Sequence, residues 1–356
     1  MKRVLLLGAG KIGSMITEML AGSGDYAVTV ADRDAAALGW IPEGKADRKT
    51  VEVTDPATLR AAMKGMDAVL SALPFYLNVR VAEAARATNV HYFDLTEDVE
   101  TTRRVRSIAE GATTAFVPQC GLAPGFVSIV AYDLARKFET LRDVRLRVGA
   151  LPVYPTNALK YNLTWSTDGL INEYCNPCEA IHEGRRREVL PLEGLEHFSL
   201  DGVDYEAFNT SGGLGTLCET LSEKAEEVNY KTVRYPGHMA YVKFLTEELR
   251  LRLRRDTLKE VLESAVPMTT QDVVLVFVSV SGQKAGRLTQ ETYAKKVYAA
   301  EMAGRMWSAI QITTSAGICA MLDLVVSGKL AARGFVRQED ARLDEFLANR
   351  FGKHYA

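Results

Sequence analysis

Three glycines with the spacing of a dinucleotide-binding turn stand close to the start of the chain. Gly8, Gly10 and Gly13 directly follow the apolar run from Val4 to Leu7. A buried parallel strand that ends in a glycine turn and continues as a helix places backbone N–H groups, and the positive end of the helix dipole, beside a bound pyrophosphate. The residues that we expect to hold the cofactor in this turn are Gly8, Ala9, Gly10, Lys11, Ile12 and Gly13.

A carboxylate follows this turn at the distance that the fingerprint requires. The second apolar run, from Ala27 to Ala31, ends on Asp32, about twenty residues past the glycines. A carboxylate at such a strand tip accepts hydrogen bonds from the adenosine ribose hydroxyls and repels a 2′-phosphate. We therefore expect the cofactor to be NAD in preference to NADP. The adjacent Arg33 is a second expected cofactor contact, and it keeps NADP open.

Three further strand ends carry groups that can contact ligands. The apolar run from Asp67 to Ala72 ends in a turn at Pro74, and we expect the cofactor to be bordered by Ala72, Leu73, Pro74 and Asn78. Without the glycine turn nearby, simple strand termination would explain the residues from Ser71 to Pro74 equally well. The segment from His91 to Asp98 has carboxylates at its tip. The segment from Val117 to Gly125 leads into a new helix, whose N-terminus favours an anion such as a substrate carboxylate.

The elements that must position these groups alternate between strands and helices. Apolar runs at 4–7, 27–31, 67–72 and 112–117 are separated by helical patterns such as Thr58–Met63 and Val79–Ala87. This alternation predicts a Rossmann-type α/β fold, in which a doubly wound parallel sheet has right-handed crossovers. The helical pattern at 306–326 is expected to pack back onto this domain. We therefore assign 1–123 and about 305–356 to the dinucleotide-binding domain.

The middle of the chain has a different pattern. Residues Val144–Val148 alternate with period two, which predicts an antiparallel strand with one solvated face, whereas the run 273–280 is apolar enough for a strand covered on both sides. Helical patterns cover Leu217–Val228 and Phe244–Ser264. We therefore expect residues 124–304 to form an inserted second α/β domain with a mixed sheet.

Composition narrows the class of partner and the location. The chain has 356 residues, and its 43 Lys and Arg against 45 Asp and Glu give a net charge of −2, which argues against nucleic acid and acidic membrane as partners. The stretch Met306–Val326 contains too many polar residues for a membrane span. The first strand starts too early for a secretory signal, so we expect a cytoplasmic protein. Cys175 and Cys178 lack a second ligand pair, so no metal site is expected.

Three separated motifs then resemble those of the saccharopine dehydrogenase family, especially its lysine 6-dehydrogenase branch. They are Gly121–Gly125, Leu159–Ser166 and Val233–His238. The resemblance implies a nucleotide domain, an inserted α/β substrate domain that pairs subunits into a homodimer or higher homo-oligomer, and amine–imine redox chemistry on an amino acid. Glutamate-forming members generally have Asp where this chain has Ala123, and an Asn-Arg-Asp stretch near Asn209–Ser211. The absence of that arginine favours a substrate with fewer acidic groups, such as free lysine.

The reaction expected from this branch is hydride transfer from the ε-carbon of L-lysine to NAD. It gives ammonia and 2-aminoadipate 6-semialdehyde, which cyclises to piperideine-6-carboxylate. Because a lysine ammonium has a pKa of about 10.4, the site must accept a proton or select the neutral amine. We expect Asp94 to be the first candidate for this step and His238 the second. The residues expected to line the substrate pocket are Tyr76, Cys120 and Arg234, the last as a clamp for the substrate carboxylate.

Purely structural roles are also open for His238 and Arg234, and two other functions of the chain stay open. His238 fits an ordinary loop histidine after a Pro-Gly turn, and Arg234 fits a structural ion pair. A saccharopine-, opine- or carboxynorspermidine-type reductase, which joins an amine to an aldehyde or keto acid, would keep the same fold. A regulator that senses NAD without turnover would bind the cofactor tightly but oxidise no amine.

Overall fold

The computed structural model describes all 356 residues, which form two compact units. Unit 1 comprises Met1–Phe126 and Gln311–Ala356, and unit 2 comprises Val127–Ile310. Both ends of the chain therefore contribute to unit 1, and unit 2 is an insertion between them.

The centre of unit 1 is a parallel sheet of seven strands in the order β17-β6-β5-β4-β1-β2-β3. Every neighbouring pair in it runs parallel. Six of these strands have the Rossmann order, and β17 adds a seventh at the edge. The predicted doubly wound parallel sheet is confirmed. The strands are β1 (Lys2–Leu7), β2 (Tyr26–Asp32), β3 (Asp47–Thr50), β4 (Ala68–Ser71), β5 (His91–Asp94), β6 (Ala115–Val117) and β17 (Gly334–Phe335).

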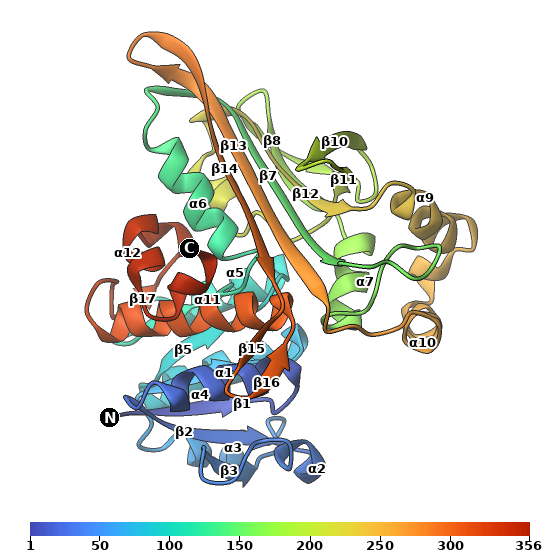
Figure 1. The fold of residues 1–356 in the computed structure, drawn as a ribbon. Coiled ribbons are helices and arrows are strands. Elements are labelled where there is room, and N and C mark those ends of the chain that lie inside the picture. Colours follow the sequence, from blue (N-terminus) through green and yellow to red (C-terminus); the bar gives the residue numbers. More distant parts are fainter. The chain divides into compact units, whose positions relative to one another are not determined.

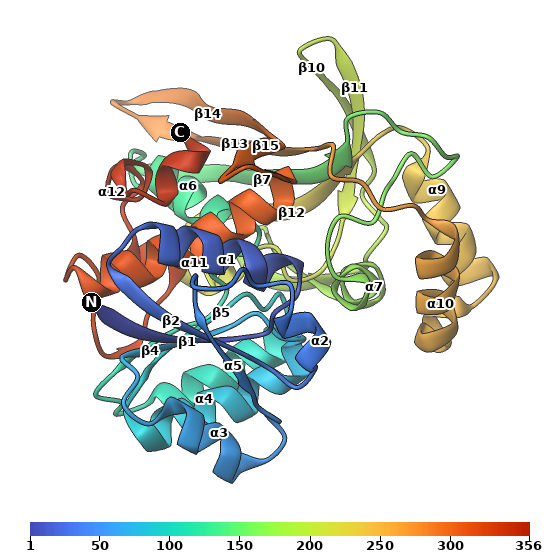
Figure 2. The same ribbon diagram turned by 60° about the horizontal axis from the view of Figure 1, so that its bottom comes forward.

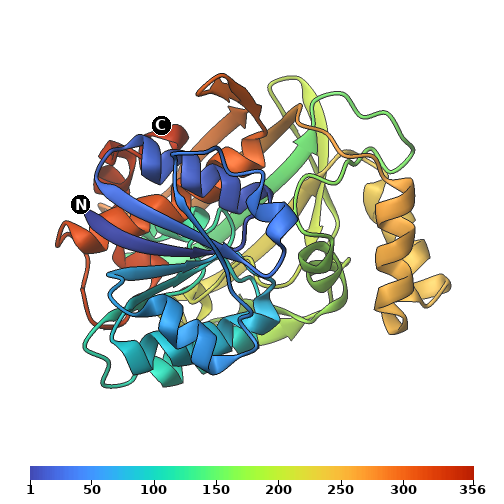
Figure 3. The same ribbon diagram turned by 90° about the horizontal axis from the view of Figure 1, so that it is seen from below.

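Helices cover both faces of this sheet (Figures 2 and 3). One face carries α3 (Pro56–Met63), α4 (Asn78–Thr88) and α5 (Val99–Ala109), and the other carries α1 (Lys11–Gly22) and α11 (Ala309–Val326). The α1 and α11 helices are joined where the Gln311 amide donates to the Lys11 carbonyl at 3.2 Å. The remaining helices of unit 1 are α2 (Ala35–Leu38), α12 (Leu343–Ala348) and the 3₁₀ turns Phe75–Leu77, Gln338–Asp340 and Gly352–Tyr355.

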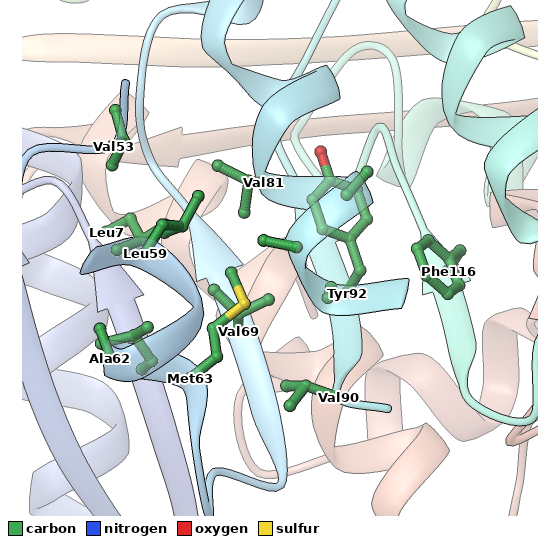
Figure 4. Close-up of a cluster of buried hydrophobic side chains, with 14 of the residues drawn as sticks. Leu7, Val53, Leu59, Ala62, Met63, Val69, Val81, Val90, Tyr92 and Phe116 are labelled. Carbon is green, nitrogen blue, oxygen red and sulfur yellow. The ribbon is translucent and has the colours of Figure 1, made fainter. Parts of the chain in front are cut away.

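The core under α3, α4 and α5 explains why these segments fold as they do. Figure 4 shows Met63 of α3 and Val81 of α4 packed against Val69, Tyr92 and other side chains of the sheet. The buried parts of the central strands, Val4–Leu7 of β1 and Ala68–Leu70 of β4, are apolar without interruption because helices cover both faces, as is usual for parallel sheets. The α11 helix is long and apolar enough to cross a membrane by length and composition, and 83% of it is buried inside the fold, as in a core helix.

Unit 2 is built on a mixed sheet in the order β10-β11-β12-β7-β13-β14, with β8 and β9 branching from β12. The β12 and β7 strands run parallel, and the other neighbours run antiparallel. Figure 1 shows β13 and β14 as a long hairpin in orange. The strands are β7 (Thr140–Pro152), β8 (Cys178–His182), β9 (Arg185–Val189), β10 (Glu196–Leu200), β11 (Val203–Asn209), β12 (Ala225–Arg234), β13 (Asp272–Lys284), β14 (Arg287–Tyr298), β15 (Ala300–Met302) and β16 (Arg305–Trp307).

Two predicted helices of unit 2 were wrong in their extent. The helix predicted over Leu217–Val228 is only α8 (Leu217–Thr220), because β12 starts at Ala225 and pairs with β7 and β11. The helix predicted over Phe244–Ser264 breaks at Arg250, whose φ is +55°. The remaining helices of unit 2 are α6 (Phe126–Ala135), α7 (Thr167–Cys175), α9 (His238–Lys243), the π-helical turn Phe244–Glu248, the 3₁₀ turn Leu251–Leu253 and α10 (Arg255–Ala265).

The prediction of an antiparallel strand with one solvated face at Val144–Val148 was also wrong in part. The β7 strand runs parallel to β12 and antiparallel to β13, and one residue of the predicted solvated face is buried. Arg145 is exposed, but Arg147 is only 3% exposed, because β7 lies in the interior of the sheet with β12 on one side and β13 on the other. Its guanidinium donates to the side chains of Asn229 at 2.8 Å and Glu196 at 3.0 Å. A buried arginine with such partners reads as a polar position in the sequence, so the alternating pattern alone gave the wrong environment.

Candidate functional site

The glycine turn of unit 1 has a different geometry at each glycine. Gly8 has φ +102°, and a Cβ there would lie 2.8 Å from the Ala72 carbonyl oxygen. A Cβ on Gly13 would lie 1.9 Å from the Gly8 carbonyl oxygen. A Cβ on Gly10, by contrast, would meet nothing within 4 Å. Two glycines therefore permit the turn and its close packing, and the middle one keeps the space in front of the turn open.

This open space lies at the start of α1. Gly10 is the N-cap residue of the helix, and no side chain caps it. The first N–H groups of a helix have no intrahelical partner, and the helix dipole favours negative charge beside them. The turn thus has the backbone donors and the free approach that a pyrophosphate needs.

Asp32 stands at the tip of β2 and supports the same turn. Its Oδ2 accepts a hydrogen bond from the Ala9 N–H at 2.8 Å, and its Oδ1 accepts one from the Asp34 N–H at 2.9 Å. Each carboxylate oxygen has a second lone pair for a ligand hydroxyl. Arg33 is exposed beside it. The sequence predicted that Asp32 lies near the glycine turn, and in the structure the Asp32 carboxylate is hydrogen-bonded to the turn at Ala9.

The end of β4 lies against the glycine turn. Ala72 donates its N–H to the Leu7 carbonyl at 2.8 Å, which continues the pairing of β4 with β1. Ala72 and Leu73 therefore lie directly beside Gly8. Asn78 is buried, and its Oδ1 accepts a hydrogen bond from the Ser71 hydroxyl at 2.6 Å. Pro74 is exposed and Tyr76 is 61% exposed. Ala72, Leu73 and the glycine turn are therefore together, whereas Asn78 points into the interior, and its contact with a cofactor stays a prediction.

Asp94 is wholly buried at the end of β5. Its Oδ1 accepts two backbone hydrogen bonds, from Thr96 and Gln119, each at 2.9 Å. Its Oδ2 accepts a third from the Tyr92 hydroxyl at 2.6 Å. Burial raises the pKa of this carboxyl, and the three hydrogen bonds partly offset that shift. The carboxylate has no exposed surface in this conformation.

Cys120 occupies a similar position one strand further on. Its thiol is buried, donates to the Val117 carbonyl at 3.0 Å, and lies 3.3 Å from the Nε2 atom of Gln338. Burial raises the pKa of the thiol well above its usual range. The side chain predicted to line the substrate pocket therefore lies in the interior of unit 1, and substrate contact through it stays a prediction.

In unit 2 the structure brings Arg234 and His238 together through a residue that the sequence did not indicate. The Arg234 Nε atom donates to the Tyr174 hydroxyl oxygen at 3.0 Å. The Tyr174 hydroxyl lies 3.0 Å from His238 Nε2, and His238 Nδ1 lies 2.8 Å from the Leu159 carbonyl oxygen. A carbonyl only accepts, so Nδ1 carries the proton and the tyrosine donates to Nε2. We call this chain of three hydrogen bonds, from Arg234 through Tyr174 and His238 to the Leu159 carbonyl, the relay. Each of its hydrogen bonds has a fixed direction.

The electrostatics of this relay keep the imidazole neutral. Burial and the Arg234 charge lower the pKa of His238 to about 3. Arg234 is 2% exposed, and its other hydrogen-bond partners are the Thr232 hydroxyl at 2.8 Å and the Val233 carbonyl at 2.9 Å. Its guanidinium also lies 4.8 Å from the centre of the Tyr161 ring. His238 would have to give up the Tyr174 hydrogen bond before it could accept a proton, so its catalytic role stays a prediction.

Tyr174 could not be found from its own sequence context, because it is one of many aromatic residues on helical patterns. Tyr161, whose ring lies under the Arg234 guanidinium, could be found from the sequence because it belongs to the motif Leu159–Ser166. Asp94 and the glycine turn belong to unit 1, whereas the relay belongs to unit 2.

Two models of known protein domains match the chain: the first lies within unit 1, and the second covers unit 2 together with the C-terminal segment of unit 1. Residues 4–117 match the model for the saccharopine dehydrogenase NADP binding domain, and residues 121–354 match the model for the saccharopine dehydrogenase C-terminal domain. The chain is 25% identical over 69% of its length to the saccharopine dehydrogenase [NADP(+), L-glutamate-forming] of Saccharomyces cerevisiae. It is 23% identical over 83% of its length to the mitochondrial alpha-aminoadipic semialdehyde synthase of Rattus norvegicus.

The fold also matches a solved structure. The apo saccharopine dehydrogenase (L-Glu forming) from Saccharomyces cerevisiae superposes with a TM-score of 0.77, at 19% identity, over 95% of this chain and 94% of that one. The alignments with the curated relatives span 58% of the yeast enzyme and 33% of the rat protein.

Proposed function

Because the chain belongs to the saccharopine dehydrogenase family, we propose that it is a nicotinamide-dependent oxidoreductase that acts on the amine of an amino acid. The observation that carries this proposal is the glycine turn of unit 1. Its middle glycine faces open space at an uncapped helix start, and Asp32 is tied to the turn through Ala9. These residues fit a dinucleotide, whose pyrophosphate would lie against Gly10 and whose adenosine ribose would meet Asp32.

We propose NAD as the preferred nucleotide. The family model and the yeast relative carry NADP in their names. Asp32 supports NAD, because a carboxylate at the tip of β2 repels the 2′-phosphate of NADP. Arg33 is exposed next to it and is the group that would favour NADP.

The proposed substrate is free L-lysine. Near the position where glutamate-forming members carry an arginine, this chain has Thr210, which is 2% exposed and has a hydroxyl without a partner. Its neighbour Ser211 donates its hydroxyl to the Asn172 carbonyl at 3.2 Å. A buried neutral hydroxyl cannot balance an additional substrate carboxylate as a guanidinium can. This supports a substrate with fewer acidic groups.

The chemistry that a bound NAD would supply is acceptance of a hydride from the ε-carbon of lysine, which would leave an imine that water converts to 2-aminoadipate 6-semialdehyde and ammonia. The chain itself must bind the amino acid and remove a proton from its ammonium group. Arg234 is the candidate for the substrate carboxylate, because its three hydrogen-bond partners are neutral. The nearby Glu173 carboxylate also acts on its charge, and Arg234 is 2% exposed, so a substrate must displace the side chains around it to reach the guanidinium. The hydrogen bond to Tyr174 orients the Arg234 guanidinium before any ligand binds.

The test is a screen of amines with NAD and with NADP, in which formation of the reduced cofactor is followed by absorbance. We expect reduction of NAD with L-lysine and release of one ammonia for each cofactor reduced. Ornithine serves as the control for chain length. Activity with saccharopine alone would reject lysine and assign this chain to the reaction of its yeast relative. No reduction with any amine, together with tight cofactor binding, would instead favour a nucleotide sensor.

A further inference from the structure

We propose that Asp94 is a positioning residue that acts on the turn Pro118–Gly125 through the backbone of Gln119. The proposal rests on the function given above and concerns how unit 1 shapes the edge of the sheet where the reaction takes place. It differs from the expectation that Asp94 takes a proton from the substrate, because the two roles make opposite demands on the side chain.

The first observation is the way in which the carboxylate is used. One oxygen, Oδ1, accepts the N–H groups of both Thr96 and Gln119 at 2.9 Å, and the other accepts the Tyr92 hydroxyl at 2.6 Å. The backbone carbonyl of Asp94 also accepts the Cys120 N–H at 2.8 Å. With 0% exposure, the side chain touches neither solvent nor any surface that a substrate can reach in this conformation.

The second observation is the conformation of Gln119. Its φ is +65°, in the left-handed region that residues with a side chain rarely adopt. Its side chain is 2% exposed, so the residue is fixed both in its backbone and in its packing. Such a conformation persists only where its surroundings hold it. The hydrogen bond from its N–H to the Asp94 carboxylate is the direct restraint on that backbone.

The third observation is that the rest of the turn is held from other elements. The Gln338 side chain donates to the Pro118 carbonyl at 2.7 Å. On α11, Gly317 lies so close that a Cβ there would be 2.4 Å from the Cys120 carbonyl oxygen. With Pro118 and Cys120 held in this way, the strained link between them is Gln119, and Asp94 is the group that stabilises it.

The turn has a functional position because it follows β6, next to the end of β5. Ligands of a doubly wound sheet bind outside the carboxyl ends of its strands. A shift of this turn would therefore change the wall of the site that a nicotinamide or a substrate would occupy, without any change in the groups that would bind the pyrophosphate. Small misplacements of this kind reduce turnover strongly.

Two substitutions of Asp94 separate the roles. In Asp94→Asn, the retained Oδ1 can still accept both backbone N–H groups, and the new amide can donate to the Tyr92 hydroxyl oxygen. The Tyr92 proton can then turn to the Asn78 carbonyl, 3.4 Å away. We expect D94N to keep kcat within about threefold of the unmodified protein and to keep its pH profile, whereas D94A loses about tenfold to a hundredfold in kcat. A proton acceptor would lose its function in both variants.

A second pair of substitutions tests the route through Gln119. Glycine adopts a positive φ without strain, so Gln119→Gly in the D94A background is expected to restore at least about a fifth of the original kcat. Gln119→Ala removes the same side chain but keeps the backbone strain, and it serves as the matched control that restores nothing. Fluorescence titration with NADH is expected to give unchanged affinity in all variants, because the glycine turn is intact.

The proposal is overturned if D94N is as inactive as D94A, or if Q119G and Q119A behave alike in the D94A background. If the unmodified protein oxidises no amine, the proposed function fails, and the same double-mutant comparison is then made on unfolding temperatures. A loss in D94A that Q119G, but not Q119A, reverses would still support positioning, and equal effects of both would reject it.

Discussion

Gly10→Ala is the substitution that separates cofactor binding from stability most clearly. The backbone of Gly10 has φ −71° and ψ −165°, which alanine also adopts, and the added Cβ would meet nothing within 4 Å. At an N-cap position, alanine is less favourable than glycine by less than about 1 kcal/mol. The unfolding temperature is therefore expected to fall by no more than about 2–4 °C.

The same methyl group would occupy the space through which a pyrophosphate approaches the turn. Loss of one hydrogen bond from a backbone N–H to a charged group costs about 1.5–3 kcal/mol. This corresponds to a rise in the Kd for NADH of about tenfold to a hundredfold. Gly13→Ala is expected to behave differently, because its Cβ would lie 1.9 Å from the Gly8 carbonyl oxygen and would disrupt the turn itself.

The assay is a fluorescence titration with NADH together with thermal unfolding of each variant. Gly22→Ala is the matched control, since it places a methyl group at the other end of α1, where the nearest atom would be the Glu18 carboxylate at 4.0 Å. It is expected to leave NADH affinity unchanged. If G10A binds NADH within twofold of the unmodified protein, the pyrophosphate does not lie against Gly10, and the assignment of the turn is refuted.

Three further outcomes follow from named contacts. Asp32→Ala is expected to weaken NAD binding more than NADP binding in paired titrations; equal losses would contradict the ribose argument. Burial raises the pKa of Asp272 from 3.8 to about 6, so the carboxyl binds its proton more tightly in the folded protein than in the unfolded chain. The free energy of unfolding is therefore expected to fall by about 2–3 kcal/mol as the pH rises from about 4 to about 6. Denaturant unfolding of Asp272→Asn should lack that slope, and an unchanged slope would reject the shift. Tyr174→Phe removes a buried partner from both Arg234 and His238, and a destabilisation of about 2–4 kcal/mol is expected by denaturant unfolding; less than about 0.5 kcal/mol would show that the relay contributes little.

The nucleotide-binding half of the fold was predictable because its signals are local. The strand β1, the glycine turn and α1 are consecutive in the sequence, and Asp32 lies at a fixed interval after them. The short edge strand β3 escaped notice because Asp47–Thr50 is exposed and polar, so it has no apolar run. Its place follows from its parallel pairing with β2, which is a tertiary contact.

The candidate site was harder to predict because burial and partners are properties of the folded chain. The sequence located Asp94 at a strand tip, but its zero exposure depends on Tyr92, Thr96 and Gln119 closing over it. His238 and Arg234 belong to one motif, yet the residue that joins them, Tyr174, comes from α7 about sixty residues earlier. Residue types indicated which side chains can do chemistry, whereas packing determined which of these side chains are buried and already hydrogen-bonded within the fold.

We propose that this chain oxidises the ε-carbon of L-lysine with a nicotinamide cofactor, and a labelling experiment tests that proposal. The most direct measurement uses L-lysine with deuterium in place of both hydrogens on the ε-carbon and follows the label by mass spectrometry. We expect one deuterium in the reduced cofactor for each ammonia released, with NAD preferred over NADP. Unlabelled reduced cofactor, or reduction that requires saccharopine in place of lysine, would contradict it.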